Sequence, residues 1–229
     1  MTNSAGKLTQ LAIAVAILGV SAHRAHADLN SVLATMDAAA AKFHTAQANF
    51  TWTMFNSVVN EGDKQTGTIY FRRSSKNTEM AADIVTPEKK QVIFSGGKIQ
   101  LYQPKLDTVD VYDASAHREE FETFLVLGFG SSGDEMRKSF DVKYDGEEKV
   151  GGTDTSKLEL TPKSDKIREQ FSQIVLWIDP KMGISVQQKL IQPNGDYRLA
   201  EYSAIRLDQK IPEKVFKLKT SPTTKTINH

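Results

Sequence analysis

Cysteine is absent from the whole chain of 229 residues. Its absence excludes disulfide bonds, zinc centres held by thiolates and cysteine nucleophiles. The fold must therefore be stabilised by the burial of apolar side chains rather than by cross-links.

Histidine is also scarce, with five in the chain. Two lie within the first 27 residues and one ends the chain, and the remaining His44 and His117 lack the paired spacing of metal ligands. No serine stands in a G-x-S-x-G elbow. We therefore expect a protein that is not an enzyme and needs no metal or cofactor. A secreted hydrolase remains an alternative, because the members of a serine–histidine–acid triad can lie far apart in a sequence.

The start of the chain carries the features of a secretory signal. Lys7 precedes an apolar run at residues 11–20, and the small-x-small triplet Ala25-His26-Ala27 follows it. A basic start, a short apolar run and such a triplet are the three parts of a signal peptide, and the run is too short to span a bilayer. We expect residues 1–27 to be removed after Ala27. Without a cysteine to carry lipid, the mature chain has no anchor of that kind.

Neither sign of charge is in large excess. Removal of residues 1–27 takes away Lys7 and Arg24, so 27 basic residues remain against 28 acidic ones. A chain so close to neutral has no general electrostatic attraction for nucleic acid or for anionic membranes. The roughly 200 remaining residues suffice for one domain with a sizeable core. We place that domain at residues 28–220 and expect residues 221–229 to form a disordered tail.

Periodicity predicts a helix over residues 28–46, where apolar side chains recur at steps of three and four. Beyond it, period-two alternation and turn residues predict strands. The predicted strands are residues 50–54, 67–73, 79–84, 91–94, 98–102, 108–112, 140–144, 155–161, 173–179, 184–192 and 197–207. We expect turns at Glu61-Gly62-Asp63, at Gly96-Gly97 and at residues 193–196.

Helical segments interrupt this succession of strands. Residues 116–127 predict a helix, and residues 134–139 and 165–170 predict short helical pieces. Strands in neighbour order, with one helix in front and one inserted midway, favour a single strongly curved antiparallel sheet. A concave apolar face covered by helices is a binding cavity for an apolar ligand.

Residues 128–133 match the G-x-G-x-x-G pattern of dinucleotide-binding proteins. The pattern has that meaning only between a strand and a helix of a βαβ unit. Here a predicted helix precedes it and antiparallel strands surround it. We therefore expect a flexible glycine hinge after the inserted helix rather than a nucleotide site.

Aromatic and methionine side chains gather in the first half of the chain and in the inserted helix. Ordinary core packing explains any one of them, but as a set they suit a deformable apolar cavity. The candidates for its lining are Phe50, Trp52, Met54, Tyr70, Met80, Phe94, Leu101, Phe121, Phe124 and Leu125.

Two arginines, Arg72 and Arg73, end a strand of otherwise apolar residues. Arginine at a sheet edge is usually just exposed. If one of them points across the concave face, its planar fork of donors can hold the carbonyl groups of a lid helix. Such a contact is a polar latch over an apolar cavity.

Several short stretches, in their order along the chain, resemble the family of periplasmic lipoprotein carriers named LolA. They are residues 46–50 (AQANF), 67–73 (GTIYFRR), 95–104 (SGGKIQLYQP), 124–128 (FLVLG), 158–163 (LELTPK) and 211–216 (IPEKVF). The resemblance spans nearly all of the mature chain. It implies a mainly β member of the α+β class, an unclosed, strongly curved antiparallel β-barrel of about 11 strands with an α-helical lid.

The resemblance also implies a function in the periplasm. Members of the family accept acylated lipoproteins from an inner-membrane ABC transporter of the LolCDE type, shield the acyl chains, and deliver them to an outer-membrane receptor of the LolB type. Arg73 best matches the arginine that holds the lid, but Ser74 stands where the family has proline, so Arg72 remains a second candidate. We expect a monomer. The alternative is a shuttle for phospholipids or glycolipids, or a lipid- or peptide-sensing module, of the same fold.

Overall fold

One twelve-stranded sheet organises the protein in its computed structural model, which describes residues 20–74, 77–117 and 127–229. In chain order the first six strands are β1 Thr45–Asn56, β2 Glu61–Arg73, β3 Thr78–Thr86, β4 Lys90–Ser95, β5 Lys98–Gln103 and β6 Thr108–Asp113. The other six are β7 Phe140–Val150, β8 Thr153–Pro162, β9 Gln173–Asp179, β10 Ile184–Ile191, β11 Tyr197–Leu207 and β12 Lys225–Asn228. The described helices are α1 Val20–Ala40, α3 Gly133–Ser139 and α4 Asp165–Arg168, with 3-10 turns η1 Ser115–His117 and η2 Glu213–Phe216.

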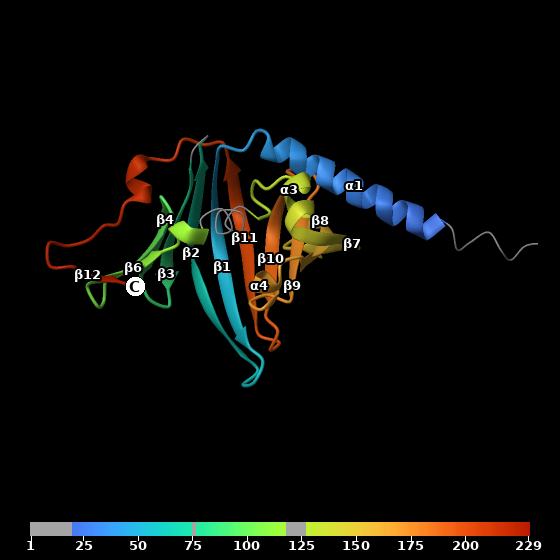
Figure 1. The fold of residues 1–229 in the computed structure, drawn as a ribbon. Helices are drawn as coiled ribbons and strands as arrows, with labels where there is room; N and C mark the ends of the chain where they lie inside the picture. Colours follow the sequence, from blue (N-terminus) through green and yellow to red (C-terminus); the bar gives the residue numbers. More distant parts are fainter. Residues whose placement is uncertain (1–19, 75–76, 118–126) are drawn as a thin grey trace, which may run out of the picture.

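The spatial order of the strands is β12-β6-β5-β4-β3-β2-β1-β11-β10-β9-β8-β7. All neighbours are antiparallel except β12, which runs parallel to β6. The sheet curls strongly without closing, so it has the shape of an open half-barrel (Figure 1). The expected fold class, an unclosed and curved antiparallel barrel that is mainly β, is therefore confirmed, with β1 at its centre between β2 and β11.

The strands differ in whether buried and exposed side chains alternate along them, and the difference depends on whether one face or both faces of the strand are covered. In β1, Ala46, Ala48 and Phe50 are buried on the concave face while the residues between them are more exposed. In β9, Ile174 and Leu176 face the concave side and Val175 faces the convex side, and all three are buried. An alternating strand has one solvated face, whereas a continuous apolar run such as β9 is covered on both faces.

The helices that the structure describes cover only one half of the concave face. Val32, Leu33 and Met36 of α1, together with Met136 of α3, pack against the inward side chains of β8 and β9. Figure 1 shows both helices at the β7–β10 end of the sheet. The concave face of β1–β5 is therefore left largely uncovered by α1 and α3.

The first helix ends earlier than its periodicity predicts. It stops at Ala40, and its last turn tightens through hydrogen bonds from the Lys42 and Phe43 amides to the Ala39 and Ala40 carbonyls. Thr45 already pairs with β2. The predicted end at residue 46 was wrong because strand pairing outweighs the local helical pattern, and Phe43 is buried in the barrel core instead.

The first hairpin also turns at a different place from the predicted one. Glu61, Gly62 and Asp63 belong to β2 and pair with the end of β1, so the predicted turn there was wrong. The chain reverses at residues 57–60, where the Asn56 side chain accepts hydrogen bonds from the Val58 and Val59 amides. Asn60 supplies the positive φ, 56°, which asparagine tolerates better than most residues.

The tail was expected to be disordered but contributes β12, which extends the sheet beside β6. The Asp107 carboxylate accepts hydrogen bonds from Ser221, Thr223 and Thr224, and these bonds fix the turn before β12. The His229 ring then contacts Asp110 at 2.8 Å. A polar sequence without an apolar pattern is ordered here by local hydrogen bonds, which periodicity does not detect.

The predicted helix over residues 116–127 lies mostly outside the described residues, as do its candidates Phe121, Phe124 and Leu125. Ser115–His117 forms a 3-10 turn. Among the helices that the structure describes, none has both the length and the apolar character needed to cross a bilayer.

Arg72 fastens the C-terminal segment to the convex face. Its guanidinium donates to Glu79 at 2.7 Å and to Glu213 at 2.6 Å, and it lies 4.3 Å from the centre of the Phe216 ring. Phe216 is buried against Ala81 and Ile93 of the sheet. Arg72 therefore belongs to the outer surface, and the expectation that it is a lid latch is corrected.

We expect Arg72→Met to lower the free energy of unfolding by about 1–3 kcal/mol, because two charge-assisted hydrogen bonds are lost. Denaturant titration measures the loss, and hydrogen exchange at residues 211–229 locates it. Lys105→Met, which breaks the exposed pair with Glu88, is the control and should change stability by less than about 1 kcal/mol. Equal effects of the two variants contradict a stabilising role for the contacts of Arg72 with Glu79 and Glu213.

The stability contributed by the contact between Arg72 and Glu213 should also depend on pH. The hydrogen bond from Arg72 lowers the pKa of Glu213 below its ordinary 4.5. A carboxylate with a lowered pKa in the folded state stabilises the fold above the pKa of the unfolded chain, and this stabilisation is lost as the pH falls through the folded pKa. The stability difference between wild type and Arg72→Met should therefore shrink below pH 4.5.

Candidate functional site

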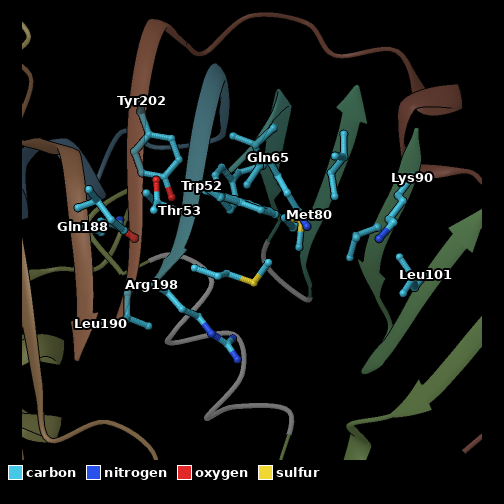
Figure 2. A pocket seen from close by; sticks show the side chains of 17 residues that line it. Trp52, Thr53, Gln65, Met80, Lys90, Leu101, Gln188, Leu190, Arg198 and Tyr202 are labelled. Atoms are coloured by element: carbon cyan, nitrogen blue, oxygen red, sulfur yellow. The ribbon is translucent and has the colours of Figure 1, made fainter. Parts of the chain in front are cut away.

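A cavity of about 470 Å³ occupies the concave face between β2–β5 on one side and β10–β11 on the other (Figure 2). Its volume lies within the range of about 300–1,000 Å³ typical of ligand sites. Its apolar lining comprises Trp52, Met54, Ile69, Phe71, Met80, Ile84, Val92, Leu101, Leu190, Leu199, Ala200 and Tyr202. Its polar lining comprises Thr53, Gln65, Lys90, Gln188 and Arg198.

Strand register explains why these side chains converge. Directly paired residues of antiparallel strands point to the same face. Trp52 of β1 pairs with Gln65 of β2 and with Ala200 of β11, and Ala200 pairs with Gln188 of β10. A row of inward side chains thus crosses four strands, although its members lie far apart in the sequence.

Aromatic rings form the uncharged wall of the cavity. Trp52 stacks on the buried Phe50 with ring centres 4.1 Å apart. Burial raises the pKa of Tyr202 above its ordinary value of 10.0, and a hydrogen bond with Trp52 offsets part of that rise. The Tyr202 hydroxyl is therefore neutral at physiological pH, and this wall presents apolar surface to a ligand.

The segment of residues 127–131 lies beside the cavity, next to Tyr202 and Phe71. Phe129 is 1% exposed, with its ring centre 5.1 Å from that of Phe71 and 4.6 Å from that of Tyr202. Phe129 thus occupies concave apolar surface that α1 and α3 leave uncovered.

Three donors from the sheet and its edge hold the carbonyl groups of this segment. Gln188 Nε2 donates to the Leu127 carbonyl at 2.6 Å, the Ser185 amide to the Gly128 carbonyl at 2.6 Å, and Arg73 Nη1 to the Gly130 carbonyl at 2.7 Å. Buried carbonyl groups need such partners because water cannot reach them. The segment is therefore fixed by polar contacts at three points.

The glycines of this segment are close-packing positions. A Cβ atom on Gly128 would lie 2.6 Å from Ser185 Cβ, and its φ of +79° is one that other residues adopt with strain. A Cβ atom on Gly130 would lie 2.7 Å from the Phe43 ring. Glycine here permits a close approach of backbone to core, and the expectation of a flexible hinge stays a prediction.

The two arginines of β2 lie on opposite sides of the sheet. Arg73 is directed to the concave side, where it contacts the Gly130 carbonyl and lies 5.5 Å from the centre of the Phe43 ring. Arg72 lies on the convex side with the C-terminal segment. Only Arg73 of this pair is therefore placed to hold the cover of the cavity.

The other predicted lining residues divide into three groups. Trp52, Met54, Met80 and Leu101 line the cavity. Phe50 and Phe94 are buried in the core cluster behind it. Tyr70 packs on the convex face with the C-terminal segment, because it alternates with the inward Ile69 and Phe71.

The second half of the chain supplies lining that the sequence reasoning missed, namely Gln188, Leu190, Arg198, Ala200 and Tyr202. Their contribution depends on the pairing of β11 with β1, which are about 150 residues apart in the chain. No local sequence pattern predicts that pairing. In the described part of the chain, no group of histidine and carboxylate side chains has an arrangement that could hold a metal ion.

The class of protein that these features define is a mainly β protein with a curved, unclosed antiparallel sheet and an apolar hollow on its concave face. The chain belongs to the family of the outer membrane lipoprotein carrier protein LolA, whose model matches residues 41–219. No curated protein matches the sequence significantly.

Solved structures share the fold at low sequence identity. An uncharacterized conserved protein from Thermus thermophilus has a TM-score of 0.55 at 9% identity, covering 88% of this chain and 99% of that one. LprF from Mycobacterium bovis has a TM-score of 0.50 at 11% identity, covering 82% and 97%. The Pseudomonas aeruginosa MucA/MucB complex gives 0.50 at 15% identity, covering 83% of this chain but only 61% of the matched chain. Identities this low show a shared fold and nothing more.

We expect Gly128→Ala to destabilise the protein by about 1–3 kcal/mol, because the new methyl group adds both backbone strain and a clash with Ser185. Gly146→Ala is the matched control. Gly146 has a similar positive φ, +91°, but nothing lies within 4 Å of its added Cβ. Denaturant titration compares the two, and an equal loss in both variants contradicts close packing at residue 128.

Proposed function

We propose that this protein is a periplasmic carrier that binds the acyl chains of lipoproteins in its concave cavity and moves them from the inner to the outer membrane. The observation that carries the proposal is the apolar cavity itself, together with the polar closure of its cover by Arg73. Membership of the carrier family supports the same function.

Burial alone is sufficient to hold such a cargo. Each methylene removed from water contributes about 0.8 kcal/mol. An acyl chain therefore needs no covalent bond to the carrier, and its release requires a competing interaction. Closure of the empty cavity is that interaction, since residues 127–131 then regain their contacts with the sheet.

In this proposal residues 127–131 are the cover of the cavity, and they have a closed and an open state. In the closed state Arg73, Gln188 and the Ser185 amide hold three carbonyl groups, and Phe129 occupies apolar surface. In the open state acyl burial replaces the packing of Phe129. A ligand shifts such an equilibrium only by its difference in affinity for the two states.

The route of the protein follows from its expected signal. Cleavage after Ala27 would leave Asp28 at the start of the helix, where a carboxylate is favourable. A free periplasmic monomer can then load at an inner-membrane ABC transporter of the LolCDE type. It unloads at an outer-membrane receptor of the LolB type.

Replacing Arg73 with leucine should leave acyl loading intact, within about twofold, but weaken delivery at least about fivefold, because the empty closed state loses one charge-assisted hydrogen bond. Loading is measured with purified acylated lipoprotein, and delivery by transfer to acceptor membranes or receptor. Gln188→Leu should act in the same direction. Arg206→Leu, an exposed arginine on β11, is the control, and normal delivery by Arg73→Leu refutes the latch.

Filling the cavity should abolish loading. Ala200→Trp places a large ring beside Trp52 and Gln188, and we expect the affinity for an acylated lipopeptide to fall at least about tenfold through lost methylene burial. Glu201→Trp, which adds the same ring to the next, exposed position of β11, should bind normally. Thermal unfolding of both variants checks that the fold is retained. Equal binding by the two variants shows that the cargo lies elsewhere.

The cargo itself distinguishes the carrier from its alternatives. Native mass spectrometry of protein purified from its own periplasm should show a bound acylated protein. Bound free lipid would favour a phospholipid or glycolipid shuttle. A bound unacylated peptide would favour a sensing module, and the MucA/MucB complex shows a protein of similar fold bound to a protein partner.

A further inference from the structure

We propose that the mouth of the cavity selects amphiphiles with a negatively charged headgroup. The inference rests on the proposed function, because the chains of such a ligand fill the same cavity, and it adds the chemical class of the headgroup. Lys90 and Arg198 carry it.

Two cations interrupt an otherwise uncharged lining. Lys90 comes from β4 and Arg198 from β11, so they face the cavity from opposite sides (Figure 2). Among the described lining residues there is no aspartate or glutamate. These two charges are thus not balanced by a carboxylate among the described lining residues.

Both cations are also free of side-chain partners within the described chain. Neither makes an ion pair there, whereas the nearby Lys105 is paired with Glu88 at 2.7 Å. The hydrogen bond from Lys105 is the main cause that lowers the pKa of Glu88, and Lys90 adds only a smaller electrostatic contribution. An ammonium and a guanidinium without an ion-pair partner among the described residues, at the rim of an apolar hollow, are a complement to a carboxylate or phosphate.

The cationic rim continues onto the other side of β4. A second hollow of about 360 Å³ shares Ile84 and Lys90 with the cavity and is lined also by Lys89 and Lys219. Three lysines there meet one carboxylate, Asp83. The buried Nε2 of Gln91 in this hollow has no hydrogen-bond partner among the described residues, so an acceptor is favoured beside it.

Polarity therefore changes along the cavity. Trp52, Phe71 and the neutral Tyr202 form its apolar interior, while Lys90 and Arg198 lie where the ligand's polar end would sit. An amphiphile with an anionic headgroup satisfies both ends at once, whereas an uncharged ester satisfies only the interior.

The test compares ligands that differ only in headgroup charge. An anthroyloxy-labelled stearic acid is compared with its methyl ester, and dioctanoyl phosphatidic acid with dioctanoylglycerol. Wild-type protein should bind the charged member about fivefold or more tightly, a factor expected of two partly exposed ion pairs. The preference should shrink at high salt. Preference within only one pair identifies the headgroup as carboxylate or as phosphate.

The double variant Lys90→Gln/Arg198→Gln should lose the preference, so that the charged and uncharged members of each pair bind within about twofold of each other. The control Lys64→Gln/Arg206→Gln removes two exposed cations of β2 and β11 that do not line the cavity, and it should keep the preference. Equal binding of charged and uncharged ligands by wild type, or a preference that survives in the double variant, overturns the inference while leaving the carrier intact. Failure to bind any of the four ligands counts against the carrier itself.

Discussion

The concave apolar face of the sheet is larger than the described helices α1 and α3 cover, and the rest of the described structure depends on this constraint. A strongly curved sheet that does not close leaves one face of every strand turned inward. The side chains of α1 and α3 bury the inward face of β8 and β9, but they do not extend over β2–β5. The uncovered part must be buried by something else, because apolar surface of this extent is unfavourable in water. That requirement is why the hollow suits an apolar ligand.

Residues 127–131 contact the sheet largely through their backbone carbonyl groups, and these groups need hydrogen-bond donors. Residues 127–131 bring carbonyl groups into an apolar environment, where an unpaired acceptor costs about 1–3 kcal/mol. Arg73, Gln188 and the Ser185 amide satisfy three of them, and glycine at positions 128 and 130 allows the approach. These bonds are directional, whereas the burial of Phe129 is not. A ligand that supplies equivalent burial replaces the second contribution only, so the polar contacts favour return to the closed state once the ligand leaves.

The sequence predicts the concave site only as far as local patterns reach. Period-two alternation located eleven of the strands and placed Trp52, Met54, Met80 and Leu101 among the candidate residues. It failed for Tyr70, because alternation gives two faces without saying which is inward, and for β12, whose order comes from Asp107. Gln188, Arg198 and Tyr202 could not be predicted, since their place depends on β11 pairing with β1. The adjacent Arg72 and Arg73 show the same limit: neighbours on a strand have opposite surroundings, and only the structure tells which is which.

Charge completes the distinction between the two ends of the cavity. The wall near residues 127–131 is neutral, since burial keeps Tyr202 protonated, and its polar groups are engaged by the cover. The rim at Lys90 and Arg198 keeps cations without partners in the described chain. A chain that entered with its headgroup first would leave that headgroup desolvated against aromatic rings, which is far less favourable than leaving it at the rim. Under the proposed function, a cargo therefore lies with its acyl end toward Phe129, and insertion of that end displaces residues 127–131.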